Sequence, residues 1–357
     1  MTGLLALIVV ILFVVTLWQM SKIFKLSQLK NKNSETAQVA NDKDNNINGK
    51  LMIMFLIFLN VITIYCFWNY TKFYLPEASS AHGGAYDTLL YISFALIMVV
   101  QVITQALLHY FAYKYQGKKG NRALFYADND KLEFIWTIIP VIVLAGLIIY
   151  GLFTWSDIMN FEEEEDAIVV ELYAKRFNWE ARYAGEDKIL GNANVRFIEG
   201  SNTVGVDASD VDAKDDVITN ELHLPVGRQV IFKLRSQDVL HSAYMPHFRA
   251  QMNVVPGMIT QFAFTPTVTT KEIRETEYMQ DKMYVIQELR KVKNEKSIAA
   301  GDGPIDDYNE FDYYLLCNKI CGASHYNMQM KIIVETQEEY DAWMATQSTF
   351  GEKIAAE

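Results

Sequence analysis

The sequence predicts a membrane-anchored α + β protein in which four transmembrane helices precede a domain of short strands, a sandwich or a barrel. Two observations support this fold class. Long runs with almost no charge are confined to residues 1–155, whereas short runs with strand periodicity occupy the rest of the chain. A third observation, the charge of the connections between the apolar runs, predicts the orientation in the membrane.

Four apolar runs are each close to the roughly 20 residues that a helix needs to cross a bilayer. They span residues 4–20, 51–68, 89–111 and 134–155. The first run could instead be a signal peptide, but it has no basic region before its apolar core and no small-residue cleavage pattern. We therefore predict four transmembrane helices.

Basic residues concentrate in two of the three connections between these runs. Six lysines lie between the first and second runs, and four lysines and one arginine lie between the third and fourth. The connection over residues 69–88 has Lys72 as its only basic side chain. Because loops rich in Lys and Arg stay in the cytoplasm, we expect both chain ends on the periplasmic side of a bacterial inner membrane, together with everything after about Ser156.

The predicted outer segment is strongly acidic. Residues 1–155 carry 12 basic and 8 acidic side chains, and residues 156–357 carry 20 and 35, which gives the outer segment a net charge of −15. Such a surface repels nucleic acid, so no nucleic-acid partner is expected. It would attract a basic protein partner, or it could serve solubility alone.

Short strands with a period of two dominate the outer segment. The stretches "ELHLPVGRQVIFKLRS", "IVVELYAKRFNWEARY", "MITQFAFTPT", "YYLLC" and "MKIIVE" each contain such a strand. Several short strands at this spacing predict a sandwich or a barrel. Two stretches break the pattern: the Asp-rich segment 202–217 is expected to be a loop, and residues 271–299 have helical composition.

The segment "CNKICGASHYNM" at residues 317–328 places four metal-binding residue types close together: Cys317, Cys321, His325 and Met328. In an oxidising compartment the two cysteines could simply form a disulfide. Thiolate, imidazole and thioether donors in one set favour copper. Zinc is the competing metal, although tetrahedral zinc sites prefer Cys and His without Met. Two bridging sulfurs could also hold two metal ions.

A second imidazole could come from the block "DVLHSAYMPHFRAQMNVVPGM", which follows the clearest strand of the outer segment. This block contains His241 and His247, and a metal ligand often lies where a strand ends. A lone histidine at a strand end is more often structural. The residues alone therefore leave both roles open for each histidine.

The sequence resembles subunit II of the haem-copper cytochrome c oxidases. The resemblance is carried by Cys317-x3-Cys321-x3-His325-x2-Met328, by "DVLHS", "MPHF" and "VPGM", by "LEFIWTIIP" at residues 132–140 and by "RFNWEARY" at residues 176–183. It implies a cupredoxin-like β-sandwich that carries a binuclear copper A centre. By the family pattern both thiolates bridge the two coppers. The remaining ligands would be His241, His325, the weak ligand Met328 and the backbone carbonyl of Lys319, with His247 left structural.

The resemblance also implies a function. Subunits of this family accept electrons from a c-type haem and pass them to haem a of subunit I, where oxygen is reduced to water with proton translocation. The expected partners are oxidase subunits I and III, the lipid membrane, and a c-type cytochrome or a tethered haem c domain. Catalytic residues for oxygen reduction are not expected in this chain.

Three further residues take roles from the resemblance. Phe177 and Trp179 match the aromatic electron-entry motif, although both could equally be core residues of a strand. Glu133 matches the entrance of a proton channel into subunit I, although a carboxylate in the first turn of a helix also stabilises the helix dipole.

Several departures from the family pattern limit what the resemblance implies. Lys319 stands where relatives have a glutamate that contributes to a magnesium site, so magnesium is doubtful. Phe177 replaces a tryptophan and Arg182 replaces an acidic residue. Docking of a freely diffusing basic cytochrome c is therefore less expected, and we predict a haem c donor held in a larger respiratory assembly.

The membrane part departs as well, because the family has two transmembrane helices. Residues 71–155 would be the family hairpin, and residues 1–70 an added hairpin with a polar cytoplasmic linker at 30–50. Residues 156–357 would form the copper domain with its two insertions. A membrane-anchored copper-delivery protein is the alternative function, since quinol oxidases lack the copper ligands and nitrous oxide reductase needs a second histidine-rich cluster that six histidines cannot supply.

Overall fold

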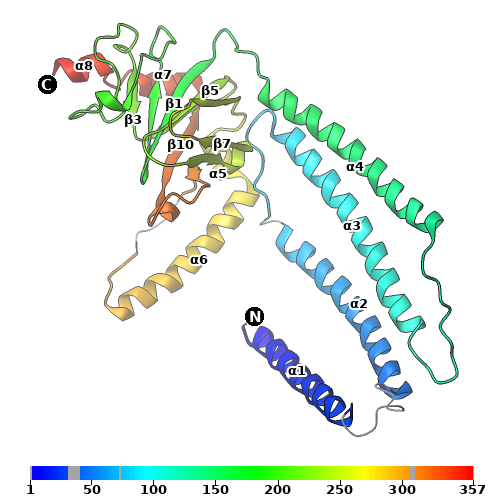
Figure 1. Cartoon of the computed structure of the whole chain (residues 1–357). Coiled ribbons are helices and arrows are strands. Elements are labelled where there is room, and N and C mark those ends of the chain that lie inside the picture. The colour runs from blue at the N-terminus through cyan, green and yellow to red at the C-terminus, as the bar shows by residue number, and fades with distance from the viewer. Residues whose placement is uncertain (1, 31–40, 72–73, 306–309, 357) are drawn as a thin grey trace. The chain divides into compact units, whose positions relative to one another are not determined.

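The computed structural model describes residues 2–30, 41–71, 74–305 and 310–356. It divides into two compact units, residues 1–68 with 96–131 and residues 69–95 with 132–357. Figure 1 shows the elements, which are α1 (Thr2–Lys30), α2 (Asp42–Tyr70), α3 (Gly83–Lys114), α4 (Asp130–Met159), β1 (Ile168–Lys175), β2 (Asn178–Tyr183), β3 (Val217–Thr219), β4 (Leu222–Pro225), β5 (Val230–Ser236), β6 (His241–Met245), β7 (Ala250–Val254), β8 (Thr260–Phe264), α5 (Thr270–Glu275), α6 (Glu277–Ala300), β9 (Tyr313–Cys317), β10 (Gln329–Glu335), α7 (Gln337–Met344) and α8 (Phe350–Ala355).

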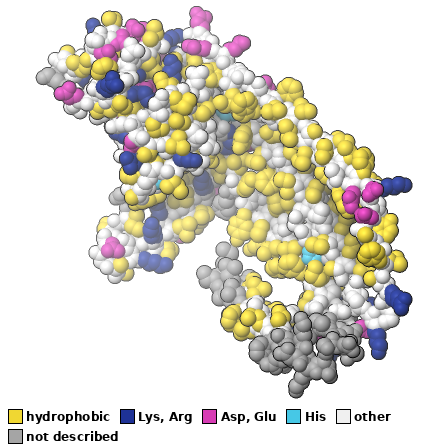
Figure 2. Space-filling view, viewed as in Figure 1, with side chains coloured by type: hydrophobic (Ala, Val, Ile, Leu, Met, Phe, Trp, Pro, Cys, Tyr) yellow, Lys and Arg dark blue, Asp and Glu magenta, His cyan; other side chains and the backbone are white. Residues whose placement is uncertain are grey.

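Within the described residues, three helices are long and apolar enough to cross a membrane: α2, α3 and α4, with 29, 32 and 30 residues. The predicted first span lies in α1, whose described side chains give a shorter apolar stretch, Val10–Ile23. Figure 2 shows hydrophobic side chains on the visible faces of the membrane-capable helices. A helix that is apolar all round requires an apolar surrounding, because only hydrocarbon leaves such a surface without cost.

The unit made of residues 1–68 and 96–131 is held by contacts between α2 and the segment around the end of α3. The Asn45 side chain donates to the carbonyl of Gly117 (2.9 Å), and the backbone N–H of Lys119 donates to the Asp42 carboxylate (2.9 Å). Residues 31–40 of the predicted polar linker lie outside the described residues. The prediction is wrong for residues 42–50, which form the first turns of α2.

The outer domain is a sandwich of two five-stranded sheets. The strand order is β3-β2-β1-β5-β8 in the first sheet and β4-β10-β9-β6-β7 in the second. Pairings are antiparallel except for β1 with β5 and β4 with β10, which are parallel. Apolar residues at every second position fill the space between the sheets, for example Val170 and Leu172 of β1 and Phe232 and Leu234 of β5. The predicted sandwich is therefore confirmed, and its core follows from the strand periodicity.

The outer face of the first sheet is covered by the Asp-rich segment 202–217, which the sequence predicted as a loop. Val204, Val206 and Ala213 of this segment pack on Tyr173 of β1 and Phe350 of α8. The same segment supplies Asp216, which binds the buried Arg182 of β2 at 2.9 Å. β1 is buried on both faces for this reason, and its sequence is apolar apart from Glu171 and Lys175.

The segment before α3 is bonded to one end of the sandwich. The backbone N–H of Ser79 donates to the carbonyl of His247 (2.7 Å), and the Ser80 hydroxyl donates to the carbonyl of Phe248 (2.8 Å). Arg249, almost fully buried, binds the carboxylate of Asp87 in the first turns of α3 with both its Nε (2.7 Å) and its Nη2 (2.9 Å). The end of the sandwich that carries Arg249 is therefore the end from which α3 leaves.

The predicted helical stretch 271–299 is confirmed as α5 and α6. Each helix begins at a threonine whose hydroxyl accepts a backbone hydrogen bond, Thr269 for α5 and Thr276 for α6. α6 ends at Gly301, whose positive φ of 86° is typical of a helix C-terminus. In Figure 1, α6 extends away from the strands rather than covering a sheet.

Candidate metal centre

The centre is built on the connection between β9 and β10. Cys317 is the last residue of β9, and its backbone N–H donates to the carbonyl of Met328 (3.0 Å), which closes the loop 317–328. The N–H of Asn318 donates to the carbonyl of Ser242 on β6 (3.0 Å), so the loop is also fixed to the neighbouring strand. β6 begins at His241, which lies beside the loop for this reason.

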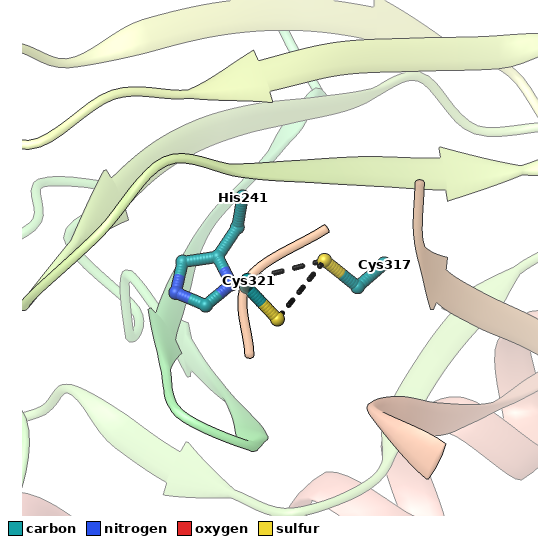
Figure 3. Close-up of side chains that lie close together, drawn as sticks. All are labelled: His241, Cys317 and Cys321. Carbon is teal, nitrogen blue, oxygen red and sulfur yellow. Dashed lines mark hydrogen bonds between the residues drawn. The ribbon is translucent and has the colours of Figure 1, made fainter. Parts of the chain in front are cut away.

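The six predicted donors lie close together, with the other four arranged around the sulfurs of Cys317 and Cys321. The distances from Cys317 Sγ are 3.7 Å to His241 Nδ1, 3.9 Å to Cys321 Sγ and 3.2 Å to the carbonyl of Lys319. The distances from Cys321 Sγ are 3.6 Å to His325 Nδ1 and 3.7 Å to Met328 Sδ. Figure 3 shows His241, Cys317 and Cys321 with their side chains directed at one another.

The two cysteines are free thiols rather than a disulfide. Their sulfurs lie 3.9 Å apart, whereas a disulfide requires about 2.05 Å. Within the described part of the chain, His241, Cys317 and Cys321 are the one group of His, Cys, Asp or Glu residues whose ligand atoms all lie within 4.8 Å of one another. All three are buried, so water does not compete freely for these ligand atoms.

The two thiols differ in acidity. Burial by itself raises the pKa of Cys317, but hydrogen bonds with His241 and with the backbone at Ser242 and Lys319 outweigh it and lower the pKa to about 6. Burial, followed by the charge of Cys317, raises the pKa of Cys321 to about 11. One thiolate therefore forms readily near neutral pH, and a bound metal ion would have to displace the second proton.

Asp238 orients His241, a role that the sequence did not predict. The Nε2 of His241 lies 2.9 Å from the Asp238 carboxylate. When Nε2 carries the proton and donates to this carboxylate, Nδ1 presents its lone pair towards Cys317, as a metal ligand must. Burial by itself raises the pKa of Asp238, but hydrogen bonds with His241, Val239 and Arg176 hold it down at about 2. The three-residue interval to His241 was the only available signal for this residue.

Arg176 and Phe177 link this carboxylate to the surface of the domain. Arg176 binds Asp238 through its backbone N–H and its Nε, both at 3.0 Å. Phe177 is partly buried against the core, and its ring lies so near Gly322 that a Cβ there would come within 2.8 Å of it. The turn between β1 and β2 therefore packs directly on the loop 317–328.

Trp179 lies in the core rather than on the surface. None of its surface is exposed, and its ring meets the His241 ring edge-on at 6.1 Å between centroids. Trp179 therefore shields His241 from water, and of these two aromatic residues only Phe177 has exposed surface.

The other residues named from the sequence lie away from the donor set. Arg182 is buried and paired with Glu171 (2.8 Å) and Asp216 (2.9 Å). The inference from Arg182 about partner docking was wrong, because its guanidinium does not reach the surface. His247 is buried against Phe311 and Tyr313. Glu133 is exposed in the first turn of α4.

The donor set fits copper. It contains two sulfurs that can bridge, two imidazoles and a thioether, and it lacks carboxylate oxygens among the described residues. Such soft donors favour copper over magnesium or calcium, and the thioether distinguishes the set from a structural zinc site. The Lys319 side chain is exposed and cationic, so it offers no ligand to magnesium.

Two protein families match this chain. The transmembrane domain of cytochrome c oxidase subunit II matches residues 68–153, and the periplasmic domain of the same subunit matches residues 170–272. Together these matches cover more than half of the chain. The chain belongs to the cytochrome c oxidase subunit II family. The matched ranges contain α3, α4 and His241 and stop before the loop 317–328.

Curated relatives extend the match. The alternative cytochrome c oxidase subunit 2 of Bradyrhizobium diazoefficiens is 30% identical over 303 residues, which cover 84% of this chain and 92% of the relative. Cytochrome c oxidase subunit 2 of Thermostichus vulcanus is 22% identical over 310 residues, covering 79% and 81%. The chain is thus a subunit of an oxidoreductase, a haem-copper oxidase. It is anchored by transmembrane helices and carries a periplasmic domain.

Solved structures with similarity include the periplasmic domain of subunit II of cytochrome oxidase from Bradyrhizobium japonicum. It has 16% identity and a TM-score of 0.30, covering 52% of this chain and 94% of that one. A heme-copper terminal oxidase dimer gives 15% identity and a TM-score of 0.31, covering 58% and 99%.

Proposed function

We propose that this subunit carries a binuclear copper A centre and relays single electrons from a c-type haem to haem a of subunit I. The observation that carries the proposal is the convergence of two thiols, two imidazoles, a thioether and a carbonyl on one buried point without a disulfide. Bound copper would supply the one-electron redox chemistry, and oxygen reduction would take place in subunit I.

The residues of this chain would hold the ligands in one geometry through both oxidation states. The Cys317–Met328 hydrogen bond closes the loop, and β6 fixes the position of His241. Asp238 fixes the orientation of the His241 ring. Because these supports are hydrogen bonds within the protein itself, little rearrangement would accompany electron transfer, and the buried sulfurs would be shielded from solvent.

The donor would approach the exposed side of the loop 317–328. Ile320 and Tyr326 are 86% and 87% exposed there, and Lys319 is exposed beside them. This part of the surface has no carboxylate of its own, so it offers apolar contact rather than attraction for a basic cytochrome. We propose a c-type haem domain held in the respiratory assembly as the donor, with oxidase subunits I and III as the other partners.

The finer points of membrane topology belong to the same proposal. We place the protein in the bacterial inner membrane with both termini on the periplasmic side, as the distribution of basic residues predicts. α1 and α2 would form the added hairpin, and Glu133 at the cytoplasmic start of α4 would lie at the entrance of a proton channel of subunit I. Magnesium has no place in the proposal because of Lys319.

Copper delivery to another protein is the second candidate function. A delivery site needs ligands that a partner can reach and exchange, whereas Cys317, Cys321 and Met328 are all buried. The burial of three ligands therefore favours a resident centre over a delivery site.

Metal analysis of the purified full chain tests the proposal, with Cys321→Ser as the decisive variant. We expect two tightly held coppers per chain and a mixed-valence electron paramagnetic resonance signal. Cys321→Ser should abolish this signal, because a serine oxygen cannot bridge two coppers as a thiolate does. Cys66→Ser is the matched control, since Cys66 is exposed on α2 and should leave the signal unchanged.

Two outcomes would contradict the proposal. One is a single labile Cu(I) per chain, which would favour delivery. The other is a Cys317–Cys321 disulfide in purified material that holds no metal.

A further inference from the structure

α6 is a structural feature that the electron-transfer function does not use. It begins after residue 272, where the match to the periplasmic domain of the family ends. Only its first half packs on the sandwich: Tyr278 contacts it at the edge, and the main contact is made by Met279, Met283 and Ile286. These positions are spaced by four and three residues, so they form one face of the helix.

A second face of α6, rotated by about 100° around the helix axis from the packed face, combines apolar and basic side chains. We call it the basic-apolar stripe, and it consists of Tyr278, Lys282, Val285, Leu289, Val292 and Lys296, with Lys293 at its edge. Val285, Leu289 and Val292 are 39%, 66% and 50% exposed. Lys293 and Lys296 are exposed and make no ion pair with any described residue.

The third face collects the carboxylates of the helix. Glu277, Asp281, Glu288 and Glu295 follow one another on this acidic stripe, and Lys291 is paired there with Glu288 at 2.7 Å. The basic-apolar stripe thus contains no carboxylate, and the one basic side chain on the acidic stripe, Lys291, is paired with Glu288. Residues 289–300 carry four basic side chains and one acidic side chain, whereas the outer segment as a whole has a net charge of −15.

The position of Tyr278 shows which way the basic-apolar stripe faces at its start. Tyr278 is partly buried against the sandwich, and Lys282, one turn later, lies 5.9 Å from the centre of the Phe311 ring, which packs on His247 two residues before Arg249. Arg249 in turn binds Asp87 at the start of α3. The stripe therefore begins beside the point at which the chain enters a membrane-capable helix, whose apolar run starts at residue 89.

We propose that α6 is an interfacial helix that lays its basic-apolar stripe on the outer surface of the bilayer, where it binds anionic phospholipid headgroups. Leu289 and Val292 would enter the boundary between headgroups and acyl chains, and the ammonium groups of Lys293 and Lys296 would contact phosphate oxygens. The acidic stripe would face water. A stripe without carboxylates is what a lipid surface requires, because carboxylates on the membrane side would be repelled by the phosphates.

The start of α6 lies near the start of the membrane-capable helix α3, and this favours lipid over a protein partner as the surface that contacts the basic-apolar stripe. α6 starts at the end of the sandwich from which α3 leaves, and its exposed cations oppose the charge of anionic headgroups. Apolar residues at intervals of four and three along a basic helix are typical of helices that lie in the membrane surface. Such a contact would hold the domain against the bilayer in addition to its covalent anchor.

Photo-crosslinking in the assembled oxidase tests this proposal. A photoreactive benzoyl-phenylalanine replaces Leu289 in one variant and Tyr284 in the other, in nanodiscs of phosphatidylglycerol or of phosphatidylcholine. These two positions are matched in exposure, at 66% and 65%, and differ in the face of α6 that they occupy. We expect lipid adducts from position 289 that increase with phosphatidylglycerol, and almost none from position 284.

A second part of the crosslinking experiment removes positive charge from α6. Lys293→Gln with Lys296→Gln should lower the lipid adduct from position 289 roughly 30-fold in phosphatidylglycerol at low salt, because each of the two cations near an anionic surface contributes on the order of 1 kcal/mol. Lys271→Gln with Lys291→Gln removes the same charge away from the stripe and should have little effect. The copper signal should be retained in every variant, which separates this test from that of the copper site.

Three outcomes would overturn the proposal. Equal lipid labelling from positions 284 and 289 would show that the helix has no preferred face. Absence of lipid adducts would place it away from the bilayer. Polypeptide adducts from position 289 in both lipids would identify a protein partner instead.

Discussion

Two buried polar clusters of the sandwich differ in how their atoms are satisfied. In the ion-pair cluster, Arg182 binds Glu171 and Asp216, and Arg235 binds Glu171 at 2.6 Å. Each charge in this cluster has an opposite charge within hydrogen-bonding distance. At the metal centre the donors approach the sulfurs at 3.2–3.9 Å, and only the imidazole of His241 has a strong partner, Asp238.

The comparison teaches that burial of polar atoms is not by itself a sign of function. We call the ion-pair cluster closed, because each of its charges lies beside an opposite charge, although Asp216 Oδ1 and Arg235 Nη1 make no hydrogen bond. We call the metal centre open, because it gathers two thiols, two imidazoles and a thioether at one place rather than pairing opposite charges. A site is indicated by this convergence of ligand atoms and not by burial alone.

The largest expected effect on the free energy of unfolding comes from removing the central cation, Arg182, from the ion-pair cluster. Arg182→Met leaves the buried Asp216 without its cation and leaves Glu171 with Arg235 alone, and breaking a buried pair in this way costs about 3–5 kcal/mol. We expect the free energy of unfolding of the outer domain to fall by this amount, measured by denaturant titration of the full chain in detergent at pH 8. The surviving folded protein should keep its copper signal.

Arg228→Met is the matched control for this variant. Arg228 pairs at 3.9 Å with Asp166, whose side chain is 71% exposed, so its loss should cost no more than about 1 kcal/mol. Equal effects of the two variants would remove the distinction between a closed buried cluster and a surface pair.

A smaller effect, on copper affinity, is expected from changing Asp238, the hydrogen-bond partner of His241 at the metal centre. Asp238→Asn keeps a hydrogen-bond acceptor for His241 but removes the negative charge. Changes to such supporting carboxylates typically lower metal affinity about 10- to 100-fold. We expect copper to be lost to a competing chelator more readily by this factor, while the free energy of unfolding of the metal-free protein changes little. Retained copper with a large loss of fold stability would make Asp238 a structural residue instead.

His247 sharpens the comparison because its imidazole is buried, has a nitrogen without a hydrogen-bond partner, and lies outside the described group of metal-binding side chains. Its Nε2 has no hydrogen-bond partner in the described structure. Burial, with smaller contributions from the charges of Lys282 and Arg249, lowers the pKa of His247 to about 3. The unfolded chain binds this proton near pH 6.5, so stability is fully present above pH 6.5 and is lost as the pH falls towards 3.

We expect the free energy of unfolding of the natural protein to fall by about 2 kcal/mol more than that of His247→Phe between pH 7 and pH 5. Denaturant titrations of both proteins across this pH range would measure the difference. Parallel pH profiles would show that His247 has the same pKa in the folded and the unfolded protein, so that its burial does not disfavour the charged form.

Most of the fold could be predicted because it depends on local periodicity. Apolar runs predicted the membrane-capable helices, and alternation predicted the strands of the sandwich, since burial repeats with the geometry of each element. The predictions failed at residues 42–50, where a polar composition hid the first turns of α2. They also failed at Arg182, because the covering segment 202–217 that buries it is far away in sequence.

The sequence by itself determined the identity of the donors, because Cys317, Cys321, His325 and Met328 lie within twelve residues and must be near one another in any fold. The residues alone left the roles of both histidines open, and the family resemblance implied His241. The tertiary structure places His241 beside the sulfurs and His247 against Phe311, and it alone decided that Asp238 orients His241 and that Trp179 is buried beside it. The physical reason is that these choices depend on which strands are neighbours. Hydrogen bonds between β6 and β9 bring residues 76 positions apart to 3.7 Å, a contact that no local pattern encodes.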